Sequence, residues 1–160
     1  MKLLALSVDT VSLSYSLFNE SVLQKYGMIK FSEYAQPKVL LELENGLRKL
    51  LKDNKVALCV MTQIDLNKND KFKLKVESEL RAVIKVECER QKVLFQELKF
   101  DGWLKKITNG TPTFKQKQKL LKKFGIKLKK SDNLLEDEKA LADTILLGEA
   151  SSRNMLQIGE

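Results

Sequence analysis

The sequence has 160 residues, 43% of them hydrophobic, and predicts a single globular domain that spans 1–160. It contains no histidine, which excludes serine–histidine and cysteine–histidine catalysis and leaves oxygen ligands, and hence Mg²⁺ or Mn²⁺, for any metal. The net charge of +8 comes from residues 101–130, which hold ten lysines and one acidic residue.

The first 31 residues predict a three-stranded antiparallel meander. Apolar residues run through 3–9, alternate with polar residues in 11–18 as in a half-exposed strand, and return in 22–31 after a tight turn. Asp9 interrupts the first apolar run, so the start of the chain is interpreted as a strand rather than a signal peptide.

Helices and strands alternate in the rest of the chain. We expect a helix that opens at Pro37, a strand at 55–62, a helix at about 69–90, a strand at 93–98, a helix at 113–124 and a last helix within 131–150. The order βββ-α-β-α-β-α-α predicts an α/β fold, in which helices flank a mixed sheet. Four acidic residues of the 69–90 helix are expected to form its solvated face: Glu77, Glu79, Glu87 and Glu89.

Two cysteines, Cys59 and Cys88, each stand in an apolar-patterned segment. This favours a buried, reduced pair in a cytosolic protein over a disulfide. No run of 18 apolar residues occurs, so no transmembrane helix is expected, and we expect a cytoplasmic protein.

Three segments, LALSVDTVSLSYSL, VMTQIDLNKN and ALADTILLGEA, resemble motifs of the RuvC-type Holliday junction resolvases, especially the compact phage and poxvirus forms. The resemblance extends over the whole length as scattered motifs. It implies a ribonuclease H-like fold with a mixed five-stranded sheet, in which a three-stranded antiparallel meander is joined by parallel strands. It also implies a nuclease that uses two Mg²⁺ or Mn²⁺ ions to hydrolyse a phosphodiester.

The resemblance assigns Asp9 and Asp143 as metal ligands. Where the family carries a glutamate on its fourth strand, this sequence offers Thr62 or Gln63, and where it carries a second ligand three residues before the helix aspartate, this sequence has Ala140. Neither Glu136 nor Glu138 replaces Ala140 at the right helical position. Two explanations stay open: a natural variant with fewer acids, and a deliberate substitution at Gln63 or Ala140 that inactivates the enzyme.

The lysine-rich segment favours binding to nucleic acid, with an anionic membrane surface and a solubilising face as alternatives. The resemblance implies that DNA-contacting residues near the site are Lys105 or Lys106 and Lys115 or Lys117. Trp103, in the same segment, is more typical of a packing residue than of a base-stacking one.

The leading hypothesis is therefore a homodimeric endonuclease that resolves four-way DNA junctions. The resemblance implies that the 69–90 helix lies at the dimer interface, as the equivalent helix does in the family. The alternatives are a non-catalytic protein that binds branched DNA and a basic module that binds nucleic acid without junction preference. By resemblance alone, so short a resolvase fits a phage or virus, and hence the cytoplasm of a host cell.

Overall fold

The computed structural model describes residues 1–32, 36–64, 70–99, 119, 122, 125 and 134–158, and at 36, 134–138 and 153–158 it describes the backbone. Its first three strands form the predicted antiparallel meander: β1 (Lys2–Val8), β2 (Ser12–Asn19) and β3 (Val22–Lys30). Between β2 and β3, Glu20 and Ser21 adopt positive φ angles of 48° and 71°, as a two-residue hairpin loop requires.

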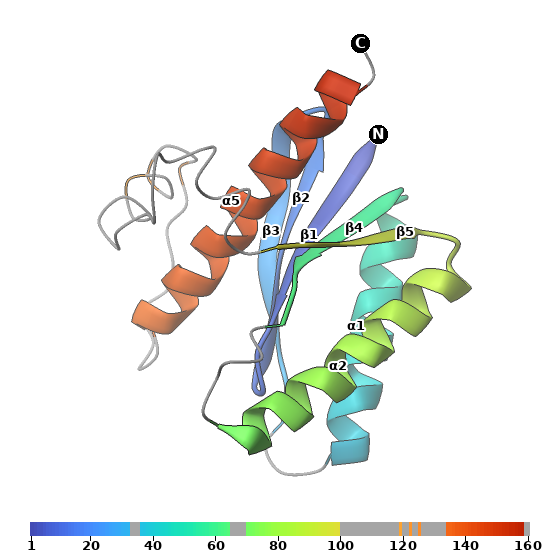
Figure 1. Ribbon diagram of the computed structural model, residues 1–160, viewed down its shortest axis with the longest axis vertical. Helices are drawn as coiled ribbons and strands as arrows, with labels where there is room; N and C mark the ends of the chain where they lie inside the picture. The colour runs from blue at the N-terminus through green and yellow to red at the C-terminus, as the bar shows by residue number, and fades with distance from the viewer. Residues whose placement is uncertain are drawn as a thin grey trace.

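Two further strands extend the meander into a mixed sheet. β4 (Leu58–Thr62) pairs in parallel with β1, and β5 (Leu94–Leu98) pairs in parallel with β4. The strand order is β3-β2-β1-β4-β5, which confirms the predicted five-stranded mixed sheet. Figure 1 shows that the sheet is strongly twisted, so that β5 lies across the direction of β1.

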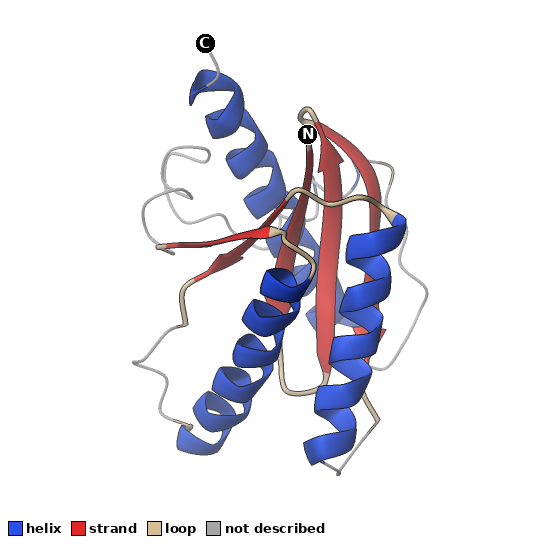
Figure 2. Ribbon diagram, turned by 90° about the vertical axis from the view of Figure 1, so that its right-hand side faces the viewer, coloured by secondary structure: helices blue, strands red, loops and turns tan. Residues whose placement is uncertain are grey.

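Helices cover both faces of this sheet. α1 (Gln36–Asp53) and α2 (Lys71–Arg90) lie side by side on one face, and α5 (Leu134–Ile158) lies on the other (Figures 1 and 2). Pro37 stands in the first turn of α1, where its missing N–H leaves no helical hydrogen bond unmade. Asp70 caps α2, because its carboxylate accepts a 3.1 Å hydrogen bond from each of the N–H groups of Phe72 and Lys73.

Alternation along the central strands divides the core between the two faces. On β1, Leu4 belongs to the cluster that packs with α1 and α2, whereas Leu3 packs with α5. On β4, Cys59 and Leu58 divide in the same way. Since the side chains of a strand repeat every two residues, this pattern assigns each later position of either strand to one of the helix layers.

Strand β2 is not half-exposed, and the prediction from its alternating pattern was wrong. Its three serines, Ser12, Ser14 and Ser16, are 6%, 1% and 0% exposed. They are buried because β2 lies inside the sheet and α5 covers the face that they line. The pattern indicates one apolar and one polar face, but a polar face can meet a helix as well as water.

Most element boundaries differ from those predicted by one or two residues, and two differ by more. The strand expected at 55–62 begins at Leu58, since Lys55 has a positive φ of 51° and the chain turns there on leaving α1. The last helix, expected within 131–150, continues to Ile158. The helix predicted at 113–124 falls outside the described residues, apart from Lys119 and Lys122.

The acidic residues of α2 do not share one solvated face, and that prediction was also wrong. Glu77 and Glu87 are 5% and 0% exposed, whereas Glu79 is half-buried and Glu89 is exposed. The physical reason is that α1 packs along α2 and supplies the cation of Arg48 to the carboxylate of Glu87. A helix that looks polar in sequence can thus bury an acid between itself and a neighbour.

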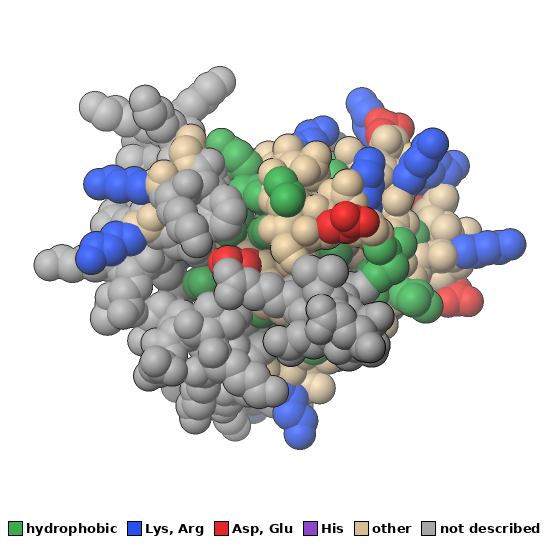
Figure 3. All heavy atoms as spheres, turned by 90° about the horizontal axis from the view of Figure 1, so that it is seen from above, with side chains coloured by type: hydrophobic (Ala, Val, Ile, Leu, Met, Phe, Trp, Pro, Cys, Tyr) green, Lys and Arg blue, Asp and Glu red, His purple; other side chains and the backbone are tan. Residues whose placement is uncertain are grey.

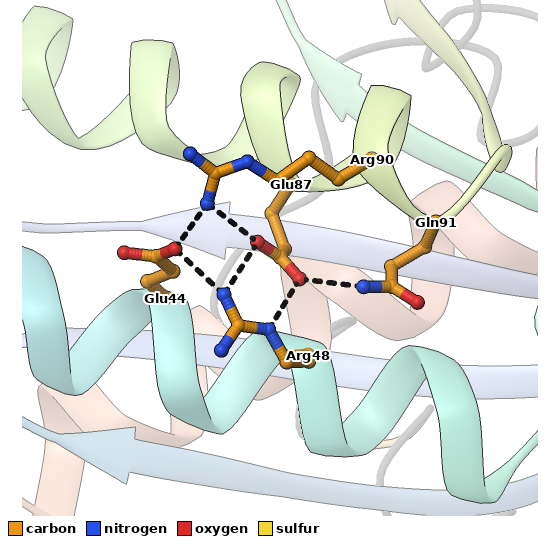
Figure 4. Close-up of polar contacts among 5 residues, drawn as sticks. All are labelled: Glu44, Arg48, Glu87, Arg90 and Gln91. Atoms are coloured by element: carbon orange, nitrogen blue, oxygen red, sulfur yellow. Dashed lines mark hydrogen bonds and ion pairs between the residues drawn. The ribbon is translucent and has the colours of Figure 1, made fainter.

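An ion-pair network joins the two helices around Glu87 (Figure 4). Arg48 Nε donates to Glu87 at 2.9 Å, Gln91 Nε2 donates to it at 3.0 Å, and Arg48 also pairs with Glu44 at 2.7 Å. Burial alone would raise the pKa of Glu87, but these hydrogen bonds and the charges of Arg48 and Arg90 outweigh it and lower the pKa. The network therefore holds α1 against α2 through an ionised carboxylate.

Cys59 of β4 and Cys88 of α2 are free and fully buried, which confirms the predicted reduced pair. A hydrogen bond to Cys88, together with burial, raises the pKa of Cys59 well above its ordinary value. Within the described part of the chain, no helix is long and apolar enough to cross a membrane.

Candidate metal and nucleic-acid site

The carboxyl ends of β1 and β4 lie at the same edge of the sheet, because the two strands are adjacent and parallel. Their ladder runs as far as Ala5 and Val60, whereas β1 continues to Val8 and β4 to Thr62. The last residues of the two strands therefore extend beyond their pairing. In open α/β sheets, ligands bind beyond such carboxyl ends.

Asp9 follows β1 directly and is exposed. Its N–H donates to the carbonyl of Ser12 at 2.9 Å, which closes the turn into β2. Its carboxylate Oδ1 accepts hydrogen bonds from the N–H and the hydroxyl of Thr10, the latter at 3.1 Å. Asp9 is therefore a turn residue, and its carboxylate stands at the sheet edge on a backbone fixed by two strands.

Thr62 and Gln63 occupy the corresponding place after β4. Leu58 and Val60 pack with α5, so alternation assigns Thr62, the last residue of β4, to the α5 layer. Gln63 is exposed, and its N–H donates to the carbonyl of Leu98 at 2.8 Å, which extends the β4–β5 pairing by one step. Strand geometry thus favours Thr62 over Gln63 as the position that shares a layer with α5.

Helix α5 runs antiparallel to β1 across the sheet (Figure 1). Ser16 Oγ donates to the carbonyl of Thr144 at 2.8 Å, and Ser16 pairs with Ala5 in the middle of β1. Further along α5, a Cβ at Gly148 would stand 2.3 Å from the ring of Phe18, which pairs with the start of β1. The N-terminal half of α5 therefore lies toward the carboxyl end of β1.

Asp143 and Ala140 belong to this N-terminal half. Asp143 is partly exposed, while its neighbours Ala142 and Thr144 are both 0% exposed. Ala140 stands one turn before Thr144, and hence about 6 Å nearer the carboxyl end of β1. The small side chain of Ala142, which packs in one cluster with Phe18, lets the helix lie close to the sheet, as the ALADTILLGEA motif predicts.

Serines line the sheet beneath this half of α5, and sequence reasoning did not identify them as part of the site. Ser7 of β1 pairs directly with Ser14 of β2, and alternation assigns both to the α5 layer with Ser16. The signal available in the sequence was the repeat Ser12-Leu-Ser-Tyr-Ser16, whose period of two places all three serines on one face. The site region is therefore polar on the sheet side as well.

The donor atoms of this region suit Mg²⁺ or Mn²⁺ in kind, because all of them are oxygens. Asp9 and Asp143 contribute carboxylates, whereas Thr62, Gln63 and Ala140 contribute no charge. Among the residues that the structure describes, no three acidic, cysteine or histidine side chains gather into a metal-binding group. Among the side chains that the structure describes, the two carboxylates of Asp9 and Asp143 fit one divalent ion better than the two ions that the resemblance implies.

The predicted DNA contacts, Lys105, Lys106, Lys115 and Lys117, lie outside the described residues, as does Trp103. Other lysines of the described part are exposed, including Lys71, Lys73 and Lys75 in the first turns of α2. In the face drawn in Figure 3, lysine and arginine side chains stand around the periphery rather than in one patch.

No protein-family model matches the sequence, and a comparison with curated proteins finds no significant match. Solved structures do match. RuvC of T. thermophilus in complex with Holliday junction substrate is 8% identical, with a TM-score of 0.76 over 98% of this chain and 96% of that chain. Another Thermus thermophilus RuvC structure is 9% identical, with a TM-score of 0.75 over 98% and 97%.

The Fowlpox virus resolvase, in complex with substrate Holliday junction DNA, is 11% identical, with a TM-score of 0.57 over 98% of this chain and 99% of that chain. The strand order β3-β2-β1-β4-β5 and the helices on both faces agree with these full-length matches. The chain therefore has the ribonuclease H-like fold of the RuvC-type Holliday junction resolvases.

Proposed function

We propose that this protein is a structure-selective endonuclease that binds four-way DNA junctions and hydrolyses a phosphodiester with Mg²⁺ or Mn²⁺. The observation that carries the proposal is the antiparallel path of α5 across the central strands (Figure 1). The N-terminal half of α5, which carries Asp143, lies toward the carboxyl end of β1, and Asp9 follows that end directly. The likeness to junction-bound resolvases over nearly the whole chain supports the substrate class.

In this proposal Asp9 and Asp143 hold the divalent ion through their carboxylates. When bound, such an ion lowers the pKa of water and neutralises charge on the scissile phosphate. The role of the protein is to orient the two carboxylates, which it does through the Asp9–Ser12 turn and the Ser16–Thr144 hydrogen bond. Lysines of the 101–130 segment would contact the DNA backbone.

A second candidate function is selective binding of branched DNA without cleavage. The observation that favours it is the absence of an acidic side chain at Thr62, Gln63 and Ala140, the positions where the resemblance implies further ligands beside Asp9 and Asp143. A site with one weakly held ion would keep the shape that recognises DNA and lose most of its hydrolytic power. The two candidates share the fold and differ only in the chemical step.

Homodimerisation through α2 completes the proposal. Paired cuts in two strands of a junction require two sites, and the surface of α2 and its surroundings offers apolar area for a partner. Phe72 and Val86 of α2 are 69% and 51% exposed, and Leu94 of the adjoining β5 is 69% exposed. Exposed large apolar side chains of this kind are typical of interfaces between subunits.

The test is cleavage of a synthetic four-way junction in Mn²⁺ and Mg²⁺, with D9N and D143N as site variants. D53N is the matched control, because it makes the same change at an exposed position at the end of α1. We expect nicking by the wild type and D53N, and its loss in both site variants with junction binding retained. Cleavage that persists in D9N and D143N would contradict the assigned ligands.

Binding at one stated salt concentration separates the remaining candidates. If the wild type does not cut but prefers the junction to a linear duplex of equal length, the second candidate is correct. Equal affinity for the two DNAs, without cleavage, would identify a basic module with no junction preference.

A further inference from the structure

Arg81 of α2 reaches the end of β4 at the position where the candidate site begins. Its Nη1 donates to the carbonyl of Thr62 at 2.7 Å. On the other edge of the same peptide unit, the N–H of Gln63 donates to the carbonyl of Leu98 at 2.8 Å. The Thr62–Gln63 peptide is therefore held from both sides, by a helix and by a neighbouring strand.

The carbonyl of Thr62 accepts a hydrogen bond from a side chain rather than from β1, because the β1–β4 ladder ends before Thr62. Paired residues of β1 and β4 end at Ala5 and Val60, two residues before Thr62. A carbonyl beyond the end of a ladder needs another donor when water cannot reach it freely. The guanidinium of Arg81 supplies that donor from α2, which covers the face of the sheet opposite to α5.

Burial of the Arg81 guanidinium is energetically costly, because one of its donors is left without a hydrogen bond. Its Nε is buried and has no hydrogen-bond partner in the structure. Burial lowers the pKa of the guanidinium, and the carboxylates of Glu97 and Glu77 act in the opposite direction. A side chain that served packing alone would have its buried donors matched, or would be apolar.

Neighbouring contacts restrict where the guanidinium can go. Glu97 of β5 is held by Lys85 of α2 at 2.9 Å, one turn beyond Arg81. Lys85 also lies over the ring of Phe95, with its Nζ 5.8 Å from the ring centroid. These contacts of Lys85 anchor α2 to β5 one turn beyond Arg81.

We propose that Arg81 is a positioning residue that sets the place of the Thr62–Gln63 peptide, and through it the geometry of the candidate site at the end of β4. The inference rests on the proposed function for its catalytic consequence, but not for its structural one. It predicts that α2 and the site are mechanically connected through one hydrogen bond. Arg81 itself touches neither metal nor DNA in this role.

The first test measures amide exchange at Gln63 relative to Val60, which lies inside the β1–β4 ladder. R81M keeps an unbranched but shorter side chain and removes every donor, and it should speed the exchange of Gln63 about tenfold relative to Val60. R81K retains one donor and should restore part of the protection. R90M is the matched control on the same helix, because Arg90 pairs with Glu44 on the α1 side. An unchanged Gln63-to-Val60 ratio in R81M would overturn the proposal.

The second test asks for an effect that general destabilisation does not produce. In a T62E background, which places a carboxylate at this peptide, R81M should raise the Mn²⁺ concentration for half-maximal nicking about fivefold, and R90M should not. Equal shifts in R81M and R90M would contradict a positioning role. If T62E and the wild type both fail to cut, the proposed function fails, while amide exchange still decides the role of Arg81.

Discussion

Gly148 of α5 lies so close to Phe18 of β2 that a Cβ at position 148 would stand 2.3 Å from Phe18 Cε2. Phe18 is fully buried, so its ring has no room to withdraw. The same Cβ would stand 3.2 Å from Ser16 Oγ, which donates to Thr144. The absence of a side chain at 148 therefore sets the height of α5 over the sheet, and with it the height of Asp143.

We expect G148A to destabilise the fold by about 1–3 kcal/mol, since overpacking a rigid core forces backbone shifts. G46A is the matched control: its Cβ would stand 2.8 Å from Ile29 Cδ1, the movable end of a flexible side chain. In α1 that change also gains helix propensity, so G46A should be near neutral. Thermal and urea unfolding measure the stability of both variants. Equal losses of stability in G148A and G46A would contradict the claim that the tight Gly148–Phe18 contact fixes α5 on the sheet.

The gain in nicking from a carboxylate added at the end of β4 should depend on which face of the strand carries it. T62E should raise Mn²⁺-dependent nicking of a four-way junction roughly tenfold or more, because Thr62 shares a layer with α5. Q63E is the control, since it adds the same charge one residue later, at an exposed position beyond the strand. Adding A140D to T62E should raise the rate again. A larger gain from Q63E than from T62E would contradict the layer assignment.

The Glu87 network should contribute stability that acid removes. The pKa of Glu87 in the folded protein lies below its ordinary value of 4.5, so the contribution is fully present above that value. It is lost as pH falls through the lowered folded-state pKa. We expect E87Q to cost about 2 kcal/mol at pH 7, below the roughly 3–5 kcal/mol of a broken buried pair, because Arg48 is 36% exposed.

Chemical unfolding at pH 7 and at several values below 4.5 checks this dependence. The stabilities of the wild type and E87Q should approach one another as the pH falls. E89Q removes an exposed carboxylate of the same helix and should leave stability within about 0.5 kcal/mol of the wild type. A constant gap between wild type and E87Q at all pH values would show that packing rather than charge explains the loss.

The buried thiols should be inert in the native protein. Cys59 and Cys88 are both 0% exposed, and burial and their hydrogen bond raise the pKa of Cys59. A thiol-specific chromogenic reagent should therefore react at the rate of unfolding and count two thiols in denaturant. Rapid reaction of either thiol under native conditions, or a count of zero, would contradict this environment.

The proposed dimer should depend on the apolar surface of α2. Val86 is 51% exposed, so V86D adds a charge that costs little in the monomer and much in an apolar interface. We expect V86D to convert a dimer to a monomer in light scattering after size exclusion, and to weaken junction cleavage. L41D is the control on α1, where Leu41 is 58% exposed. Dissociation by L41D and not by V86D would show that the interface lies on α1 instead of α2.

The order of the described elements and their division into strands and helices were accessible from the sequence, because they depend on local periodicity. Alternation identified the meander, and the apolar spacing identified α1 and α2 to within a few residues. Asp9 and Asp143 were named through their resemblance to known motifs, and their roles stay predictions. The small residues around Asp143 also predicted a helix that lies close to the sheet, as the 0% exposure of Ala142 shows.

Contacts between distant segments were decided only by the tertiary structure. Ser14 and Glu87 look solvated in sequence, yet α5 covers one and α1 covers the other. The hydrogen bond from Arg81 to Thr62 joins residues 19 positions apart, and no local sequence pattern predicts it. Periodicity reports which face of an element is polar, whereas packing of the layers decides whether that face meets water, a helix or a site.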